Sequence, residues 1–275
     1  MGFRISTNVA SLAAQRQLEK SESRVSHAIR ALSSGERIVK AGDDAAGFAI
    51  SESLRGQAAS LKVAKNNADS AVGLIQVAEG GLNEQNNILI RLRELAVQSA
   101  SDTVGDEERE FLQTEFDQLL KEFDRIAATT TYGQKKLLVG SNEEFEFHLG
   151  TGKEEVNVIR YKLDADTRAA ELGIGEISVS DQDDARDSLE NVDAALLNIA
   201  KARAGFGAIQ SRLEIAGNNL DLQHENVLAA RSRIADADVA FETAELIQGQ
   251  VLRDFGVAVL AQANQNPTSA LRLLA

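Results

Sequence analysis

Residues that could do chemistry are few in this chain, and none completes a catalytic or metal-binding pattern. His224 and Glu225 begin the H-E-x-x-H pattern of zinc proteases, but Leu228 stands where the second histidine is required. The other two histidines, His27 and His148, are tens of residues away. The sequence therefore predicts no zinc site on this helix.

A phosphate-binding loop and a calcium loop are also incomplete. Gly150 to Lys153 matches the end of a phosphate loop, but Phe147 replaces its first glycine and Glu154 replaces the hydroxyl residue that binds magnesium. An acidic cluster lacks the glycine turn and the final glutamate of a calcium loop, and it indicates the acidic start of a helix: Asp181, Asp183, Asp184 and Asp187. We predict no catalytic residue, no metal and no cofactor, and an enzyme is the less favoured class.

Composition restricts the partners of the chain. The formal net charge of −13 argues against nucleic-acid binding, because phosphates would be repelled. Cysteine is absent, which excludes disulfides and thiolate metal sites. No apolar run is long enough for membrane insertion, and the N-terminus lacks the apolar core of a secretory signal. If the protein is exported, we expect a route without a cleaved signal peptide.

Two long rows of apolar residues dominate the sequence, and both repeat at every seventh position. Such a narrow stripe predicts a coiled-coil helix, and two rows of equal length, about 64 Å each, predict an antiparallel pair. Gln57, Gln85 and Gln223 interrupt the companion rows three positions later. The first row is Leu54, Leu61, Ala68, Ile75, Leu82, Leu89 and Ala96, and the second is Val192, Ile199, Phe206, Leu213, Leu220, Val227 and Ile234.

Both ends of the chain predict further amphipathic helices. Asn8 is a suitable cap for the first, which should end near Gly35 and carries a basic flank, whereas the C-terminal helix is acidic. We expect these arms to be mobile in the monomer and to become ordered on assembly, through polymerisation residues on both. These are Val9, Leu12, Val25, Ile29, Leu32, Leu252, Phe255, Val259, Asn264 and Gln265.

Between the two rows, the sequence predicts a shorter helix followed by strands. Asp102 or Asp106 should cap the helix, whose apolar positions run from Leu112 to Ile126. Alternating residues and glycines then indicate a β-rich segment at about 130–180, placed at one end of the bundle. The expected fold is mainly α: an elongated antiparallel coiled-coil helical bundle with a small β-rich cap.

Several motifs resemble those of bacterial flagellin, the subunit of the flagellar filament. The match covers roughly residues 1–135 and 188–275, and its blocks together are highly specific. The blocks are Ile5–Leu12, Leu32–Ile38, Ala41–Ile50, Ala78–Leu82, Arg91–Gln98 and Ala261–Gln265.

The resemblance implies a domain organisation and a set of partners. Residues 1–42 and 235–275 would form an inner terminal-arm domain, and residues 43–234 an outer helical bundle without an inserted variable domain. The chain would polymerise with itself into an extracellular flagellar filament after type III export. An export chaperone would hold the C-terminal arm, and the filament cap and hook-junction proteins would contact the polymer.

The resemblance also singles out Arg91, Leu95 and Glu115. In the family, these positions lie on a face that packs between subunits and is sensed by a vertebrate Toll-like innate receptor. We interpret them first as assembly contacts and second as receptor contacts. Two alternatives stay open from the sequence: a hook–filament junction protein, which shares the terminal motifs at lower fidelity, and a non-flagellar coiled-coil adaptor.

Overall fold

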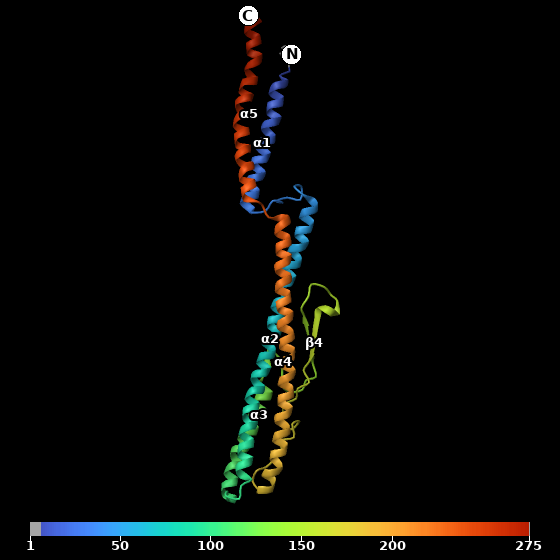
Figure 1. Cartoon of the computed structure of the whole chain (residues 1–275), viewed down its shortest axis with the longest axis vertical. Coiled ribbons are helices and arrows are strands. Elements are labelled where there is room, and N and C mark those ends of the chain that lie inside the picture. The colour runs from blue at the N-terminus through green and yellow to red at the C-terminus, as the bar shows by residue number, and fades with distance from the viewer. Residues whose placement is uncertain (1–6, 275) are drawn as a thin grey trace. The chain divides into compact units, whose positions relative to one another are not determined.

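Helices make up most of the structure, a computed structural model that describes residues 7–274, with side chains described as far as Gln265 (Figure 1). The helices are α1 (Val9–Ser34), α2 (Ala45–Ser99), α3 (Asp106–Thr129), α4 (Gln182–Ala235) and α5 (Val239–Leu274). The strands are β1 (Thr131–Tyr132), β2 (Lys135–Lys136), β3 (Glu144–His148) and β4 (Val158–Lys162), with a short 3₁₀ helix η1 (Glu155–Asn157). The predicted mainly α fold with a small β region is confirmed.

The chain divides into two compact units. Met1–Gln57 and Asn226–Ala275 form one, which we call the terminal unit, and Ala58–Glu225 form the other, the central unit. Helices α2 and α4 contribute to both. The predicted domain boundaries at residues 42 and 235 stay a prediction.

In the central unit, α2 and α4 run antiparallel, as predicted. Ion pairs between the helices join Arg93 to Asp193 at 2.7 Å, Glu79 to Arg203 at 3.6 Å and Lys65 to Asp221 at 3.9 Å. The residue numbers of the α4 partners rise as those of the α2 partners fall, as in an antiparallel pair. Eleven residues of the two predicted rows are almost fully buried here: Leu61, Ala68, Ile75, Leu82, Leu89, Ala96, Val192, Ile199, Phe206, Leu213 and Leu220. Leu54 and Val227 belong to the terminal unit and are half-buried.

One of the polar interruptions, Gln85, is fully buried at the junction of three segments. Its Nε2 donates to the backbone carbonyl of Phe123 in α3, at 3.3 Å, and to that of Thr167, at 3.2 Å. A buried donor is tolerated when it is hydrogen-bonded, so these two bonds explain how the amide nitrogen of Gln85 is accommodated at an apolar position. Gln85 therefore fixes α3 and the linker before α4 against α2.

The start of α3 differs from the prediction. Gly105 is the N-cap, and its backbone N–H donates to the Glu108 carboxylate at 2.7 Å. Asp106 is the first helical residue and pairs with Arg109 instead of capping the helix. Three acidic residues in the first turn offset the helix dipole, so a side-chain cap is not needed here.

The β region forms two antiparallel hairpins, β1–β2 and β3–β4. The β3–β4 hairpin lies against the sides of α2 and α4, and not at an end of the bundle as predicted. Asn67 Nδ2 donates to the His148 carbonyl at 3.1 Å, and the Tyr161 ring lies 5.7 Å from that of Phe206. Phe206 is near the middle of α4, which places the hairpin along its flank.

Candidate subunit-packing surface

In the terminal unit, α1 and α5 pack closely in antiparallel orientation. Asn8 caps α1 by accepting the Ser11 N–H at 3.0 Å, and Gly35, in the left-handed conformation with φ 72°, ends the helix, as predicted. Asn8 Nδ2 also donates to the Ala263 carbonyl of α5 at 2.8 Å, and Ser11 donates to Asn264 at 2.9 Å. Asn8 therefore both caps α1 and holds α5 against it.

The two helices meet through small residues. Ala14, Ser21 and Ala28 are buried on α1, while α5 buries Gly249 and Ala263. A Cβ built on Gly249 would lie 2.7 Å from Val25 Cγ2. At Gly249 the helices are too close for a side chain on α5, and many large apolar residues of both helices are exposed.

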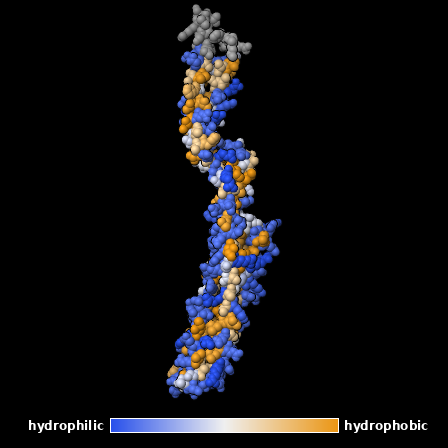
Figure 2. All heavy atoms as spheres, viewed as in Figure 1, coloured by the Kyte–Doolittle hydropathy of each residue, from blue (hydrophilic) through white to orange (hydrophobic). Residues whose placement is uncertain are grey.

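Most of these large apolar side chains lie on the outside of the pair, where Figure 2 shows orange residues on the surface over α1 and α5. Phe255 is 66% exposed and Phe241 62% exposed. Isolated exposed apolar residues are common, but a monomer rarely exposes so many along two helices. The exposed set is Val9, Leu12, Ile29, Val239, Phe241, Ile247, Val251, Phe255, Val257 and Val259.

The predicted polymerisation residues fall into three groups. Val9, Leu12, Ile29, Phe255 and Val259 are exposed, Leu32 and Leu252 are half-buried, and Gln265 is exposed. Val25 is buried against Gly249 and Asn264 accepts from Ser11, so these two pack within the pair.

Short connectors hold the two helices of the terminal unit together, which sequence reasoning did not find. The Arg37 N–H donates to the Ala235 carbonyl at 2.6 Å, and the Ala237 N–H donates to the Gly35 carbonyl at 2.9 Å. An ion pair between Glu36 and Arg231 reinforces them. Backbone pairing of this kind has no signature in side-chain types.

The three residues at positions 91, 95 and 115 are not equivalent. Arg91 Nη2 lies 2.7 Å from Glu115 Oε1, and Nη1 lies 3.0 Å from Glu94 Oε2. Hydrogen bonds to Glu115 and then to Glu94 raise the pKa of Arg91 above its ordinary value. Leu95 is fully buried, so the structure places it in the core of the central unit, where it offers no surface to a partner.

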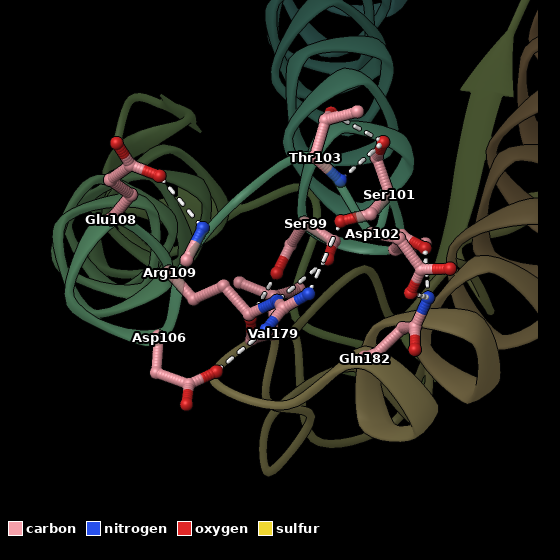
Figure 3. A network of polar contacts seen from close by, with 11 residues as sticks. Ser99, Ser101, Asp102, Thr103, Asp106, Glu108, Arg109, Val179 and Gln182 are labelled. Carbon is pink, nitrogen blue, oxygen red and sulfur yellow. Dashed lines mark hydrogen bonds and ion pairs between the residues drawn. The ribbon is translucent and has the colours of Figure 1, made fainter.

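A polar clasp around Arg109 closes the end of the helix bundle (Figure 3). Arg109 is 8% exposed and donates to the Ser99 carbonyl at 3.0 Å, the Ser101 carbonyl at 3.2 Å and the Asp106 carboxylate at 2.7 Å. Gln182, at the start of α4, donates to the Ala100 carbonyl at 3.0 Å. The clasp satisfies carbonyls at the end of α2 and joins it to α3 and α4.

Among the residues that the structure describes, no three or more histidine, aspartate or glutamate side chains are grouped as metal ligands would be. In that same part of the chain, no helix combines the length and apolarity that a membrane crossing requires.

Two family models match most of the chain. The bacterial flagellin N-terminal helical region matches residues 5–143, and the bacterial flagellin C-terminal helical region matches residues 189–274. The chain belongs to the bacterial flagellin family. Of the first motif that resembled this family, Ile5 and Ser6 lie outside the described residues.

Relatives match along nearly the whole chain. A flagellin of Halalkalibacterium halodurans is 38% identical over 98% of this chain and 99% of its own length. Flagellin FlaB1 of Treponema pallidum is 39% identical over 98% and 99%, and the flagellar filament core protein flaB2 of Brachyspira hyodysenteriae is 38% identical over 98% and 99%. The chain is accordingly a structural subunit of a flagellar filament that serves motility.

Solved structures agree with this family. Bacillus cereus flagellin superposes with a TM-score of 0.51 at 27% identity, covering 60% of this chain and 94% of that one. A putative flagellar hook-associated protein from Vibrio parahaemolyticus gives a TM-score of 0.60 at 11% identity, covering 70% and 100%, and this likeness concerns the fold alone. The comparisons lend no support to a hook–filament junction protein or to a non-flagellar adaptor.

Proposed function

We propose that α1 and α5 are the polymerisation arms of the subunit and that they bind neighbouring copies through their outward apolar residues. The observation that carries the proposal is the close α1–α5 packing through small residues, which leaves large residues such as Phe255 and Val259 exposed. Burying one such side chain stabilises a contact by about 1.5–3 kcal/mol. Ten of them along two helices favour assembly strongly.

The proposal includes the predicted domains and the order of events. Residues 1–42 and 235–275 form the inner part of the filament, and residues 43–234 the outer part. The arms are mobile before assembly, and ordering them opposes premature polymerisation because fixing a backbone costs about 1–2 kcal/mol per residue. A head-to-tail contact that does not close then produces an open helix of subunits.

Export and accessory partners follow from the same role. The subunit leaves the cell through the type III apparatus without a cleaved signal peptide, and a chaperone covers the C-terminal arm until then. The family membership and the exposed apolar residues of α5 support this assignment. The filament cap and the hook-junction proteins are the remaining partners.

We also propose that the exposed Arg91–Glu115 pair belongs to a packing face between subunits and, second, to the surface that a vertebrate Toll-like receptor contacts. Support comes from the exposure of both side chains, 47% and 45%. Leu95 is left out of this surface because it is buried.

Deletion of Asn264–Ala275 tests the arms. The truncated chain should form no filaments in electron micrographs, because Asn264, which accepts from Ser11 of α1, and the end of α5 are lost, while the central unit keeps its helical circular dichroism signal. The matched control is the substitution Leu197→Ser on α4, because Leu197 is exposed in the central unit and lies outside both arms; this variant should form normal filaments. Normal filaments from the truncated chain would refute the proposal.

A further inference from the structure

An open groove lies where the β3–β4 hairpin meets α4 in the central unit. It has a volume of about 430 Å³, enough for a large side chain. Its floor is apolar and buried, formed by Leu61, Leu149, Ile159 and Leu220, which are 4–8% exposed.

The rim of the groove is apolar on two sides and basic on a third. Val156 of η1 is 84% exposed and Ile215 of α4 is 67% exposed. Arg212 of α4 also lines the groove. Exposed aliphatic residues around a buried apolar floor are typical of a docking site for an aromatic or aliphatic side chain with acidic neighbours.

The central unit also carries a side chain with these properties. Phe111 of α3 is 74% exposed, although phenylalanine is normally buried. Glu107, one helical turn earlier, and Glu110 are exposed beside it. The aromatic ring supplies the shape that the groove requires, and the carboxylates supply the charge that complements Arg212.

A chain cannot place its own Phe111 in its own groove. Arg109 contacts the carbonyl of Ser99 and Glu115 pairs with Arg91, which puts Phe111 beside α2 at about residue 96. The groove contains Leu61 of the same helix. At about 1.5 Å per residue, the two sites are roughly 50 Å apart along α2.

We propose that Phe111 of one copy docks into the groove of a second copy, between Val156 and Ile215 and near Arg212. The occupant is a copy of this chain, because the chain is a filament subunit. Phe111 and the groove also lie at different heights along α2 of the same central unit, so a second copy shifted along that axis can bring them together. Repeating the contact translates each copy by roughly 50 Å and gives an open row. The proposal rests on polymerisation and names a specific contact outside the arms, one helical turn from Glu115 on α3.

Cysteine cross-linking tests the contact, because the chain has no cysteine of its own. Filaments are grown from an equal mixture of Phe111→Cys and Ile215→Cys chains and oxidised briefly. We expect a disulfide-linked dimer in the mixture and not with either variant alone. In the double variant, we expect a ladder of multimers. The matched control replaces Ile215→Cys with Leu197→Cys, since Leu197 is 57% exposed on α4 but does not line the groove, and it should give no dimer.

A polymerisation assay gives a second reading. Because Phe111 is exposed, Phe111→Ser should leave unfolding unchanged but raise the critical concentration by about tenfold or more. Glu107→Arg and Arg212→Glu should each slow elongation, and the double variant should recover part of the rate.

The outcomes separate this inference from the proposed function. Filaments without the mixed dimer, or an unchanged critical concentration for Phe111→Ser, would overturn the Phe111 contact alone. Dimers without a ladder in the double variant would also overturn it, because they indicate a closed reciprocal pair. Failure of the unmodified chain to form filaments under any condition would instead contradict the proposed function.

Discussion

Gly249 of α5 lies so close to Val25 of α1 that an added Cβ would be 2.7 Å from Val25 Cγ2. Gly249→Ala should therefore push the helices apart. The strain of overpacking, about 1–3 kcal/mol, exceeds the gain of about 1 kcal/mol that alanine brings to a helix. We expect faster hydrogen exchange in α1 and α5 and a higher critical concentration.

The control for this substitution is Gly73→Ala in α2. No side chain lies within 4 Å of a Cβ built there, so only the helix propensity changes. Gly73→Ala should stabilise the monomer by up to about 1 kcal/mol. If Gly249→Ala behaves in the same way, the α1–α5 contact is looser than described.

Gln85→Leu should destabilise the central unit. The substitution keeps the volume but removes the donor that Gln85 offers to the buried carbonyls of Phe123 and Thr167, at a cost of about 1–3 kcal/mol. Urea unfolding of the monomer measures the change. Gln57→Leu is the matched control, because Gln57 occupies the same heptad position four repeats earlier and is exposed, so its effect should stay within about 0.5 kcal/mol.

Arg109→Met should open the clasp at the end of α2. It removes donors from the carbonyls of Ser99 and Ser101 and leaves Asp106 unpaired, for an expected loss of about 2–4 kcal/mol. The loss should appear in urea unfolding and as faster amide exchange around residues 99–105. Arg125→Met, which removes an exposed arginine of the same helix, should change stability by less than about 0.5 kcal/mol. Equal losses would contradict the special role of Arg109.

Acid should destabilise the central unit through Asp166. The Arg168 side chain, followed by its backbone N–H, lowers the pKa of Asp166 in the folded state. A lowered folded pKa means that the stabilisation is complete above the unfolded value of about 3.9 and is lost as the pH falls through the lower folded pKa.

Urea midpoints between about pH 6 and pH 2.5 measure this dependence. Asp166→Asn should flatten the acid slope more than Asp193→Asn, although Arg93 lowers the pKa of Asp193 as well. The Asp166 side chain is 20% exposed and that of Asp193 is 52% exposed, so solvent screens the second pair more. A steeper loss of stability with acid in Asp166→Asn would contradict the prediction that ionised Asp166 stabilises the folded state.

The sequence predicted the features that depend on periodicity and local capping. The seven-residue rows identified α2 and α4 as an antiparallel pair, and Asn8 and Gly35 marked both ends of α1. These features follow from local rules, because side chains three and four positions apart share a face.

Features that depend on long-range contacts were not predictable from the sequence. The β3–β4 hairpin lies on the flank of the helices because of contacts such as Asn67 with His148, and the clasp around Arg109 depends on distant carbonyls. The resemblance assigned Leu95 to a surface, but the side of α2 that carries Leu95 faces the core of the central unit, and the side chain is fully buried. The connectors near Gly35 and Ala235 pair through backbone atoms, which any residue type provides.

The pairing of α1 with α5 has a consequence for quality control. The small buried face of α1 packs against α5, so a product that terminates before α5 leaves that face bare and lacks the Ala263 carbonyl that accepts from Asn8. We expect such a shortened molecule to be excluded from a growing filament, because it offers neighbouring copies no complete α1–α5 pair.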